Sequence, residues 1–335
     1  MKPGSMHDEF EQMKYLVTGA SGFVGFALLE RLKLNGDTVV EVGRRQSGSD
    51  AGCFFQINDF SADTLFTEAL SGCDVVIHLA ARVHVMHDSA DDPLAAFQAV
   101  NLHGTVNLAR QAARAGVRRF VYVSSIKVNG EYTCGQPFTE LDEPKPQDPY
   151  AVSKWQAEQA LHQIGRETGM EIVIVRPPLV YGPGVKANFY SLMKLVSKRL
   201  PLPLGAIRNR RSMIYVGNLA DALITCATHP AAAGQTYLVS DGEDVSTPQL
   251  VKEIAAAMQR PDRVFPFLLS VMRFCARMIG RSSAVDRLTQ SLEIDSSKIR
   301  KELGWRPPYS MQQGLRVTAD WFLQSKDGAG QQNDR

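Results

Sequence analysis

Cysteine is scarce in this sequence, and its few copies are scattered. The chain of 335 residues has five cysteines, and no two of them form a C-x-x-C pair. An odd set without such pairs indicates neither a disulfide framework nor a zinc site. They are Cys53, Cys73, Cys134, Cys226 and Cys275. We therefore expect a protein of the reducing cytoplasm with no metal site.

Net charge and long apolar segments are also lacking. The formal charge is only +2, which argues against nucleic acid as a partner and for a small anionic ligand. Val264 to Ile279 is strongly apolar but is short and carries Arg273 and Arg277. We interpret it as a lid or packing helix in preference to a membrane contact, and expect no stable membrane insertion. Residues 1–12 have no apolar core of a signal peptide and are interpreted as a tag-like or disordered leader.

A glycine-rich stretch between Lys14 and Gly25 organises the chain. Gly19, Gly22 and Gly25 lie three residues apart, between a strand-like and a helix-like segment. At such a junction the first glycine permits a tight turn, the second lets the backbone approach a pyrophosphate, and the third lets helix and strand pack closely. The pattern predicts a phosphate-binding turn, although the triplet alone also fits a loop without a ligand.

From residue 14 to about 180, strand-like and helix-like segments alternate. The expected strands are Tyr15–Val17, Thr38–Val42, Cys53–Ile57, Val75–Leu79, Phe120–Ser124 and Ile172–Arg176, with helices over residues 61–70, 93–115 and 149–168. This order predicts an α/β fold, a doubly wound parallel sheet of the Rossmann type. We assign residues 13–180 to this dinucleotide-binding domain.

Beyond residue 180 the pattern becomes irregular because prolines interrupt it. Expected here are helices near 187–199 and 218–228, a strand at 236–239 and a helix from 247. We assign residues 181–325 to a smaller, mainly substrate-binding region at the C-terminal edge of the sheet, and residues 326–335 to a disordered tail.

A tyrosine and a lysine stand four residues apart at the start of the helix over residues 149–168. Tyr150 and Lys154 therefore share one helix face, so the ammonium can lie close to the phenol. A free tyrosine has a pKa of about 10, and a neighbouring cation lowers it. One crossover earlier, the strand ends in Ser124-Ser125. Together with the glycine turn earlier in the chain, Ser125, Tyr150 and Lys154 predict a proton-transfer site.

Together these motifs resemble the extended short-chain dehydrogenase/reductases, in particular the nucleotide-sugar epimerase/dehydratase group. The resemblance covers residues 14 to about 322 and rests on Thr18-Gly-Ala-Ser-Gly-Phe-Val-Gly25, His78-Leu-Ala-Ala81, Asn101-Leu-His-Gly-Thr105, Tyr150-x-x-x-Lys154, Arg176-Pro-Pro-Leu-Val-Tyr-Gly-Pro183 and Leu303-Gly-Trp305. It implies a bound nicotinamide dinucleotide, a catalytic triad of Ser125, Tyr150 and Lys154, a UDP-sugar substrate, and a homodimer formed through the helices over residues 93–115 and 149–168.

The resemblance also implies roles for further positions. Around the cofactor it places Gly19, Ser21, Gly22, Phe23, Gly25, Asp59, Phe60, Ala80 and Ala81, together with Tyr150 and Lys154. Around the sugar nucleotide it places Ser125, Asn188, Pro203, Leu204, Gly205, Arg211 and Arg287. Arginine suits the diphosphate because its planar fork binds phosphate oxygens in two places, while a solvated loop is the alternative for both arginines.

Three departures from the family pattern bear on function. Gly43-Arg44-Arg45 stands where NAD-binding members end the second strand with an acid, which favours NADP(H) over NAD(H). Leu179 replaces an asparagine that many epimerases and dehydratases have near the substrate phosphate, and this weakens a galactose-type epimerase assignment. Ser125 is followed by Ile126-Lys127 without an acid pair, so we set aside 4,6-dehydration.

Two stretches, Arg82-Val-His-Val-Met-His87-Asp88 and Gly184-Val-Lys-Ala-Asn-Phe-Tyr190, are similar to a bacterial subgroup that makes UDP-N-acetylquinovosamine for polysaccharide assembly. The first hypothesis is therefore an NADP(H)-dependent reductase of a UDP-4-keto-6-deoxy-N-acetylhexosamine. The alternative is a UDP-hexose 4-epimerase that oxidises C4 transiently, and a third is a dinucleotide-sensing regulator, against which the intact triad argues. His84 and His87 form no larger His/Cys cluster, so we interpret them as loop or substrate-pocket residues.

Overall fold

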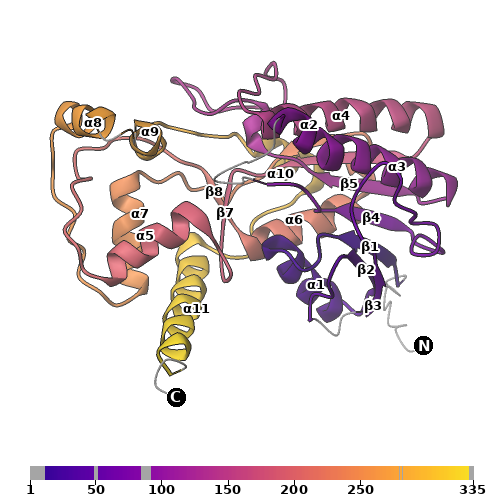
Figure 1. Cartoon of the computed structure of the whole chain (residues 1–335), viewed down its shortest axis with the longest axis horizontal. Helices are drawn as coiled ribbons and strands as arrows, with labels where there is room; N and C mark the ends of the chain where they lie inside the picture. The colour runs from indigo at the N-terminus through magenta and orange to yellow at the C-terminus, as the bar shows by residue number, and fades with distance from the viewer. Residues whose placement is uncertain (1–11, 49–51, 84–91, 279, 281, 332–335) are drawn as a thin grey trace, which may run out of the picture.

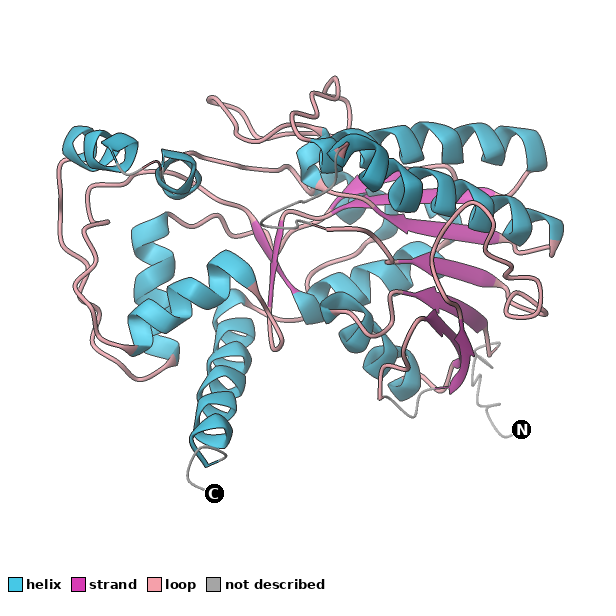
Figure 2. Ribbon diagram, in the orientation of Figure 1, coloured by secondary structure: helices cyan, strands magenta, loops and turns pink. Residues whose placement is uncertain are grey.

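The main body of the protein is a seven-stranded parallel sheet (Figures 1 and 2). The structure is a computed structural model that describes residues 12–48, 52–83, 92–278, 280 and 282–331. In the order β3-β2-β1-β4-β5-β6-β9, the strands are Gly52–Gln56, Thr38–Gly43, Lys14–Thr18, Val75–His78, Arg119–Val123, Glu171–Arg176 and Thr236–Leu238. The order reverses at β1, as in a doubly wound sheet, and the predicted fold class is confirmed.

Helices cover both faces of this sheet because its strands are apolar on both sides. Helices α1 (Phe23–Leu34) and α6 (Val216–Thr228) share one buried cluster with alternate strand residues. Helices α3 (Thr105–Arg114) and α4 (Pro149–Thr168) share the other. Continuous burial of β4 and β5 fits the rule that strands of a parallel sheet are covered on both faces.

The chain after residue 180 builds a second, smaller part and also returns to the sheet. Strands β7 (Leu179–Tyr181) and β8 (Met213–Tyr215) pair in parallel, and a third core lies around helices α5, α7 and α11. The helices are α5 (Ala187–Ser197), α7 (Thr247–Ala257), α8 (Leu269–Met278), α9 (Ser282–Thr289), α10 (Ser297–Leu303) and α11 (Met311–Gln331). Since α6 and β9 pack on or pair with the main sheet, residues 216–238 complete it.

Residues 61–70 form turns, so the helix predicted there is wrong. Asn107 and Gln111 of α3 donate to the Thr64 carbonyl oxygen at 2.7 and 2.8 Å, and Gln111 accepts the Phe66 N–H at 2.8 Å. These side chains take up backbone groups that a helix would pair internally. The tertiary contact with α3 thus replaces the local helix.

Two further helical segments differ in detail from the sequence prediction. The helix expected over residues 93–115 consists of α2 (Pro93–Gln98), a π-helical turn η1 (Ala99–Gly104) and α3. Helix α11 runs through residues 326–331, where a disordered tail was predicted, and residues 332–335 lie outside the described part. Among the described helices, none combines the length and the apolar composition needed to cross a membrane.

Candidate active site

The glycine turn lies where β1 passes into α1, beside the end of β4. Gly19 has a φ of +71°, and a Cβ there would lie 2.7 Å from the backbone nitrogen of Ala80. A Cβ on Gly25 would lie 2.3 Å from the Gly19 carbonyl oxygen, so only glycine fits at both positions. Gly22 is the N-cap of α1 and provides no side-chain cap. The turn therefore brings the exposed Ser21 and Gly22 to the N-terminus of α1, where backbone N–H groups lack partners within the helix.

A buried chain of hydrogen bonds joins this turn to β4. Thr18 Oγ1 lies 2.5 Å from His78 Nδ1 and accepts the Ala80 N–H at 3.2 Å, and His78 Nε2 lies 2.9 Å from Thr105 Oγ1. Burial lowers the pKa of His78 well below its usual value, which keeps the ring neutral. Ala80 and the half-buried Ala81 follow at the same edge. Sequence reasoning gave His78 no role, although its position at the end of a buried strand was a usable signal.

Ser125, Tyr150 and Lys154 come together beyond the C-terminal end of β5. The Ser125 hydroxyl hydrogen-bonds the Tyr150 phenol and accepts the Lys127 N–H at 3.3 Å. Lys154 is buried, donates to the Val123 carbonyl oxygen at 2.8 Å, and has its Nζ 6.0 Å from the centre of the Tyr150 ring. The structure thus assembles the three residues that the sequence singled out.

Burial dominates the electrostatics of the Tyr150 and Lys154 pair. Burial raises the pKa of Tyr150 to about 12, the charge of Asp148 raises it as well, and the Ser125 hydrogen bond lowers it. Burial lowers the pKa of Lys154 to about 7, against an opposing effect of Glu158. A lysine with this pKa carries only part of its charge near neutral pH. The expected lowering of the Tyr150 pKa by Lys154 is not found in this structure, because burial of the phenol raises that pKa.

A charged trio beside the triad was not predicted from the sequence. Lys127 Nζ lies 2.6 Å from Asp148 Oδ2 and 2.9 Å from Glu131 Oε1. Asp148 also caps α4, since its Oδ1 accepts the Ala151 N–H at 2.7 Å. A carboxylate two residues before Tyr150 was visible in the sequence as a helix cap. Its ion pair with Lys127 comes from two separate segments and had no local signal.

The π-helical turn also holds the site in place. Asn101 in η1 is buried, donates to Ser153 Oγ at 3.0 Å, and exchanges hydrogen bonds with the backbone of Arg82. It therefore ties the segment after β4 to the helix that carries Tyr150 and Lys154. Insertions of this kind in helices are frequent at functional sites.

The residues predicted around the adenosine end of the cofactor lie on the C-terminal side of β2 and β3. Arg44 and Arg45 are exposed and directly follow β2. Asp59 is exposed and accepts from Thr64 Oγ1 at 3.2 Å. The Phe60 ring stacks on His78, with centroids 5.0 Å apart, so its side chain faces the core.

The residues predicted around the sugar nucleotide lie in the smaller part, and two of them meet. Arg211 Nη1 donates to the Arg287 carbonyl oxygen at 2.9 Å. Burial lowers the pKa of Arg211. Asn188 is exposed in the first turn of α5. Of the segment Pro203 to Gly205, Leu204 is buried, while Gly205 donates its N–H to the Phe265 carbonyl oxygen at 2.9 Å.

Leu179 is 39% exposed at the start of β7. His84 and His87 lie outside the described residues. Within the described ranges, no three His, Cys, Asp or Glu side chains are grouped so as to hold a metal ion.

The profile of the NAD dependent epimerase/dehydratase family matches residues 15–240, which include the glycine turn, Ser125, Tyr150 and Lys154. The chain belongs to this family. It is 46% identical to UDP-glucose 4-epimerase of Vibrio cholerae, over 93% of this chain and 96% of the relative. It is 28% identical to N-acetyl-alpha-D-glucosaminyl-diphospho-ditrans,octacis-undecaprenol 4-epimerase of Escherichia coli O157:H7, over 93% and 96% of the two chains. The solved structure of MoeE5 in complex with UDP-glucose and NAD matches with a TM-score of 0.73 and 25% identity, over 93% of this chain and 99% of that one.

Proposed function

We propose that this member of the family is a UDP-hexose 4-epimerase that oxidises C4 of the sugar transiently and reduces it again on the other face. The observation that carries the proposal is the meeting of Ser125, Tyr150 and buried Lys154 beside the glycine turn. The 46% identity to UDP-glucose 4-epimerase over nearly the whole chain supports the epimerase over the ketoreductase considered first.

The residues around the glycine turn fit a nicotinamide dinucleotide, since Gly19 and Gly25 permit a tight turn in which a Cβ at either position would collide with the backbone. When bound, the dinucleotide supplies the acceptor and donor of hydride. In its phenolate form, Tyr150 would take the proton from the C4 hydroxyl, and it would later return this proton to the C4 oxygen. Ser125 donates a hydrogen bond to the same oxygen. Lys154 positions Tyr150 from the same helix face, and its Nζ lies 4.5 Å from the centre of the Tyr122 ring.

The sugar nucleotide is held, in this proposal, by the smaller part of the molecule. Arg211 and Arg287 provide positive charge for the diphosphate, and Asn188 provides an amide at the start of α5. Pro203 to Gly205 line the nucleobase. The placement of both arginines at one site is supported by the hydrogen bond from the Arg211 guanidinium to the Arg287 carbonyl oxygen. This bond holds α9 next to the segment before β8.

Interconversion of UDP-hexoses without net change of the nicotinamide tests this function. The protein is incubated with UDP-glucose or UDP-N-acetylglucosamine and catalytic NAD, and the products are separated while absorbance of the reduced nicotinamide is followed. We expect the 4-epimer to accumulate to equilibrium with no net reduction of the cofactor. Absence of the 4-epimer with both sugars would contradict the proposal.

Reduction of a UDP-4-keto sugar is the second candidate, and one local feature favours it. Gly43 carries no carboxylate toward the adenosine ribose, and the exposed Arg44 and Arg45 follow it. This arrangement suits the 2′-phosphate of NADPH, a cofactor used for net reduction. If NADPH is consumed in proportion to a UDP-4-keto sugar and no UDP-hexose is epimerised, the reductase is the correct assignment.

The expected homodimer remains a prediction. Helices α2, α3 and α4 lie side by side on one outer layer of the sheet (Figure 1). This layer corresponds to the surface through which the family resemblance places the second copy.

Replacing Arg211 by alanine is expected to weaken UDP binding by roughly 1.5 to 3 kcal/mol, because a charge-assisted contact to the diphosphate is lost. Isothermal calorimetry with UDP measures the change. Arg210→Ala is the matched control, since Arg210 is 64% exposed and pairs with Glu293 and Asp244. Unchanged UDP affinity in Arg211→Ala, with the same thermal stability, would remove Arg211 from the site.

Replacing Asp148 by asparagine is expected to move the pH profile of kcat to lower pH. The Asp148 charge raises the pKa of Tyr150, so a neutral side chain lets the proton-accepting phenolate form at lower pH. Asparagine still caps α4, so the helix start is kept. Glu131→Gln changes the other carboxylate on Lys127 and is the control. If the midpoint of the kcat pH profile stays in place or rises in Asp148→Asn, the Asp148 charge does not raise the pKa of Tyr150.

A further inference from the structure

Helix α8 carries apolar side chains on two opposite sides. Leu269 and Met272 pack against the third core cluster. Val271, Phe274 and Met278 are 41, 64 and 74% exposed. Their spacing of three and four residues places them on one helix face, turned away from the packed one. Single exposed apolar side chains are ordinary, but a joined face needs an explanation.

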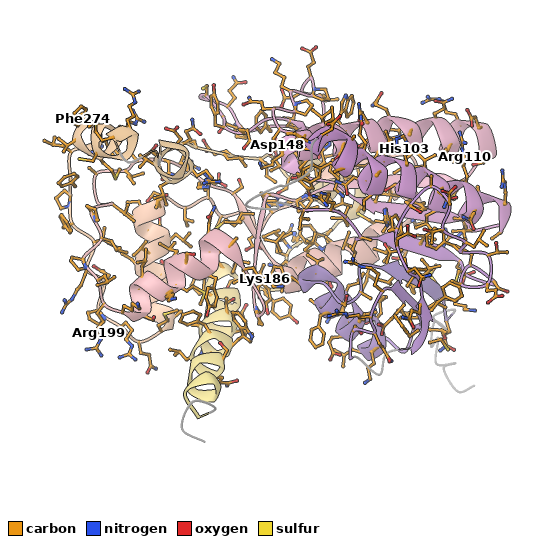
Figure 3. The ribbon with its side chains drawn as sticks, viewed as in Figure 1. His103, Arg110, Asp148, Lys186, Arg199 and Phe274 are labelled. Atoms are coloured by element: carbon orange, nitrogen blue, oxygen red, sulfur yellow. The ribbon has the colours of Figure 1, made fainter. Side chains whose placement is uncertain are left out.

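The segment before α8 extends this face. Phe265, Phe267 and Leu268 are 40, 38 and 70% exposed, and the two phenylalanine rings lie 6.5 Å apart at an angle of 83°. We call the six residues Phe265, Phe267, Leu268, Val271, Phe274 and Met278 the apolar end patch. Phe274 marks its place at the end of the molecule opposite the main sheet (Figures 1 and 3).

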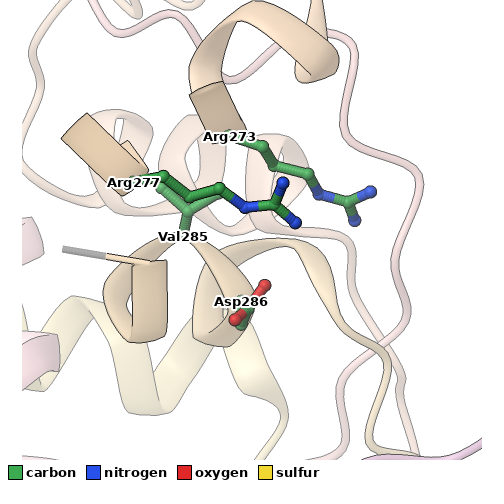
Figure 4. Close-up of a pocket in the computed structure, with 4 residues that line it drawn as sticks. All are labelled: Arg273, Arg277, Val285 and Asp286. Atoms are coloured by element: carbon green, nitrogen blue, oxygen red, sulfur yellow. The ribbon is translucent and has the colours of Figure 1, made fainter. Parts of the chain in front are cut away.

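Positive charge borders the apolar end patch. Residues 260–278 include four arginines and one acidic residue, Asp262, and α8 itself has no acidic residue. Arg273 and Arg277 are exposed, one helical turn apart, on the side of α8 that faces α9. With Val285 and Asp286 they line a hollow of about 240 Å³ (Figure 4). Aromatic and aliphatic side chains beside a basic stripe are the composition of a helix that lies on a lipid surface.

Helix α8 packs through Leu269 and Met272, as expected from the sequence. Against the sequence-based interpretation of its other side, we propose that the apolar end patch docks this protein on the surface of an anionic phospholipid bilayer, with no helix inserted across it. The phenylalanines, Leu268 and Met278 enter the boundary between headgroups and acyl chains, and Arg273 and Arg277 approach lipid phosphates. Charge favours this occupant over a second copy of the chain, because a two-fold contact through the patch would bring the same arginines together. A nucleotide sugar is too polar to cover an apolar face.

Vesicle flotation tests the docking without any substrate, so its outcome is independent of the proposed function. The full chain is mixed with vesicles of phosphatidylcholine alone or of phosphatidylcholine with phosphatidylglycerol. We expect binding to the anionic vesicles, weaker binding to the neutral ones, and a decrease with added salt. The pair Phe274→Asp with Met278→Asp is expected to lower partitioning to anionic vesicles at least about tenfold, because two apolar side chains that enter the bilayer are lost.

Two control variants distinguish vesicle binding through the apolar end patch from nonspecific vesicle binding. Leu141→Asp changes a side chain that is 96% exposed in another loop and should bind vesicles like the unchanged protein. Arg273→Gln with Arg277→Gln should weaken binding to anionic vesicles only. Vesicle binding that is absent in the unchanged protein, or equal in the Phe274 and Met278 variant, overturns the proposal. A second result would also overturn it. In that result the unchanged protein does not bind vesicles, and sedimentation velocity shows that it self-associates whereas the Phe274 and Met278 variant does not.

Discussion

Tyr150→Phe is expected to lower turnover at least about a hundredfold, because the variant loses the hydroxyl that exchanges the proton with the C4 oxygen. The ring itself stays, and with it the edge contact to Phe97 at 6.1 Å. Folding and binding of both ligands should therefore change little. Initial rates with UDP-glucose, together with calorimetry for UDP and for the dinucleotide, measure the two effects separately.

Tyr132→Phe is the matched control for this substitution. Tyr132 is 45% exposed and lies only a few residues after Ser125, so removal of its hydroxyl should leave turnover unchanged. Turnover near that of the unchanged protein in Tyr150→Phe would exclude this residue as the proton-transfer group. A combined loss of turnover and of UDP affinity would contradict the expectation that the substitution removes only the proton-transfer hydroxyl.

Arg44→Ala with Arg45→Ala is expected to shift the preference for NADPH over NADH by roughly tenfold or more for each residue. Only NADPH carries the 2′-phosphate, and a charge-assisted contact to a partly exposed phosphate contributes about 1 to 2 kcal/mol. Calorimetric titrations with NADPH and with NADH give the ratio of the two affinities. The same pair of changes at Arg306 and Arg316, both exposed in the C-terminal segment, is the control for the loss of two positive charges.

Gly43→Asp is expected to go further and to favour NADH over NADPH. An acid at this position binds the ribose 2′-hydroxyl of NADH and repels the 2′-phosphate of NADPH. The structure leaves room for it: the nearest atom to a Cβ on Gly43 lies 3.4 Å away, and the residue does not have a positive φ. Equal losses for NADH and NADPH in the double arginine variant would show that these side chains do not distinguish the two cofactors.

The main sheet and the triad could be predicted because each depends on local sequence. Buried strands are continuous apolar runs, Gly19 and Gly25 occupy positions where a Cβ would collide, and Tyr150 and Lys154 are brought together by one helical turn. The seventh strand β9 was seen as a strand, but its place beside β6 depends on a crossover that no local pattern records.

Features that depend on contacts between distant segments could not be predicted. The turns over residues 61–70 exist because α3 side chains occupy the backbone there. The ion pair of Lys127 with Asp148 joins η2 (Ile126–Val128) to the cap of α4. The raised pKa of Tyr150 follows from burial. The four-residue spacing of Tyr150 and Lys154 indicates that their side chains are close, but it does not indicate how deeply they are buried. Which apolar side chains of α8 are exposed likewise depends on which of them pack against the third core, and the sequence does not record that contact.

Retention of a label at C4 tests the central claim most directly. UDP-glucose that carries deuterium at C4 is incubated with the protein and a catalytic amount of cofactor, and the UDP-hexoses are analysed by NMR and mass spectrometry. In a transient oxidation the hydride that leaves C4 is the one that returns, so we predict that the 4-epimer keeps the deuterium and the cofactor ends in its starting state. Formation of the 4-epimer with loss of deuterium, or no 4-epimer while a UDP-4-keto sugar consumes NADPH, would contradict the account.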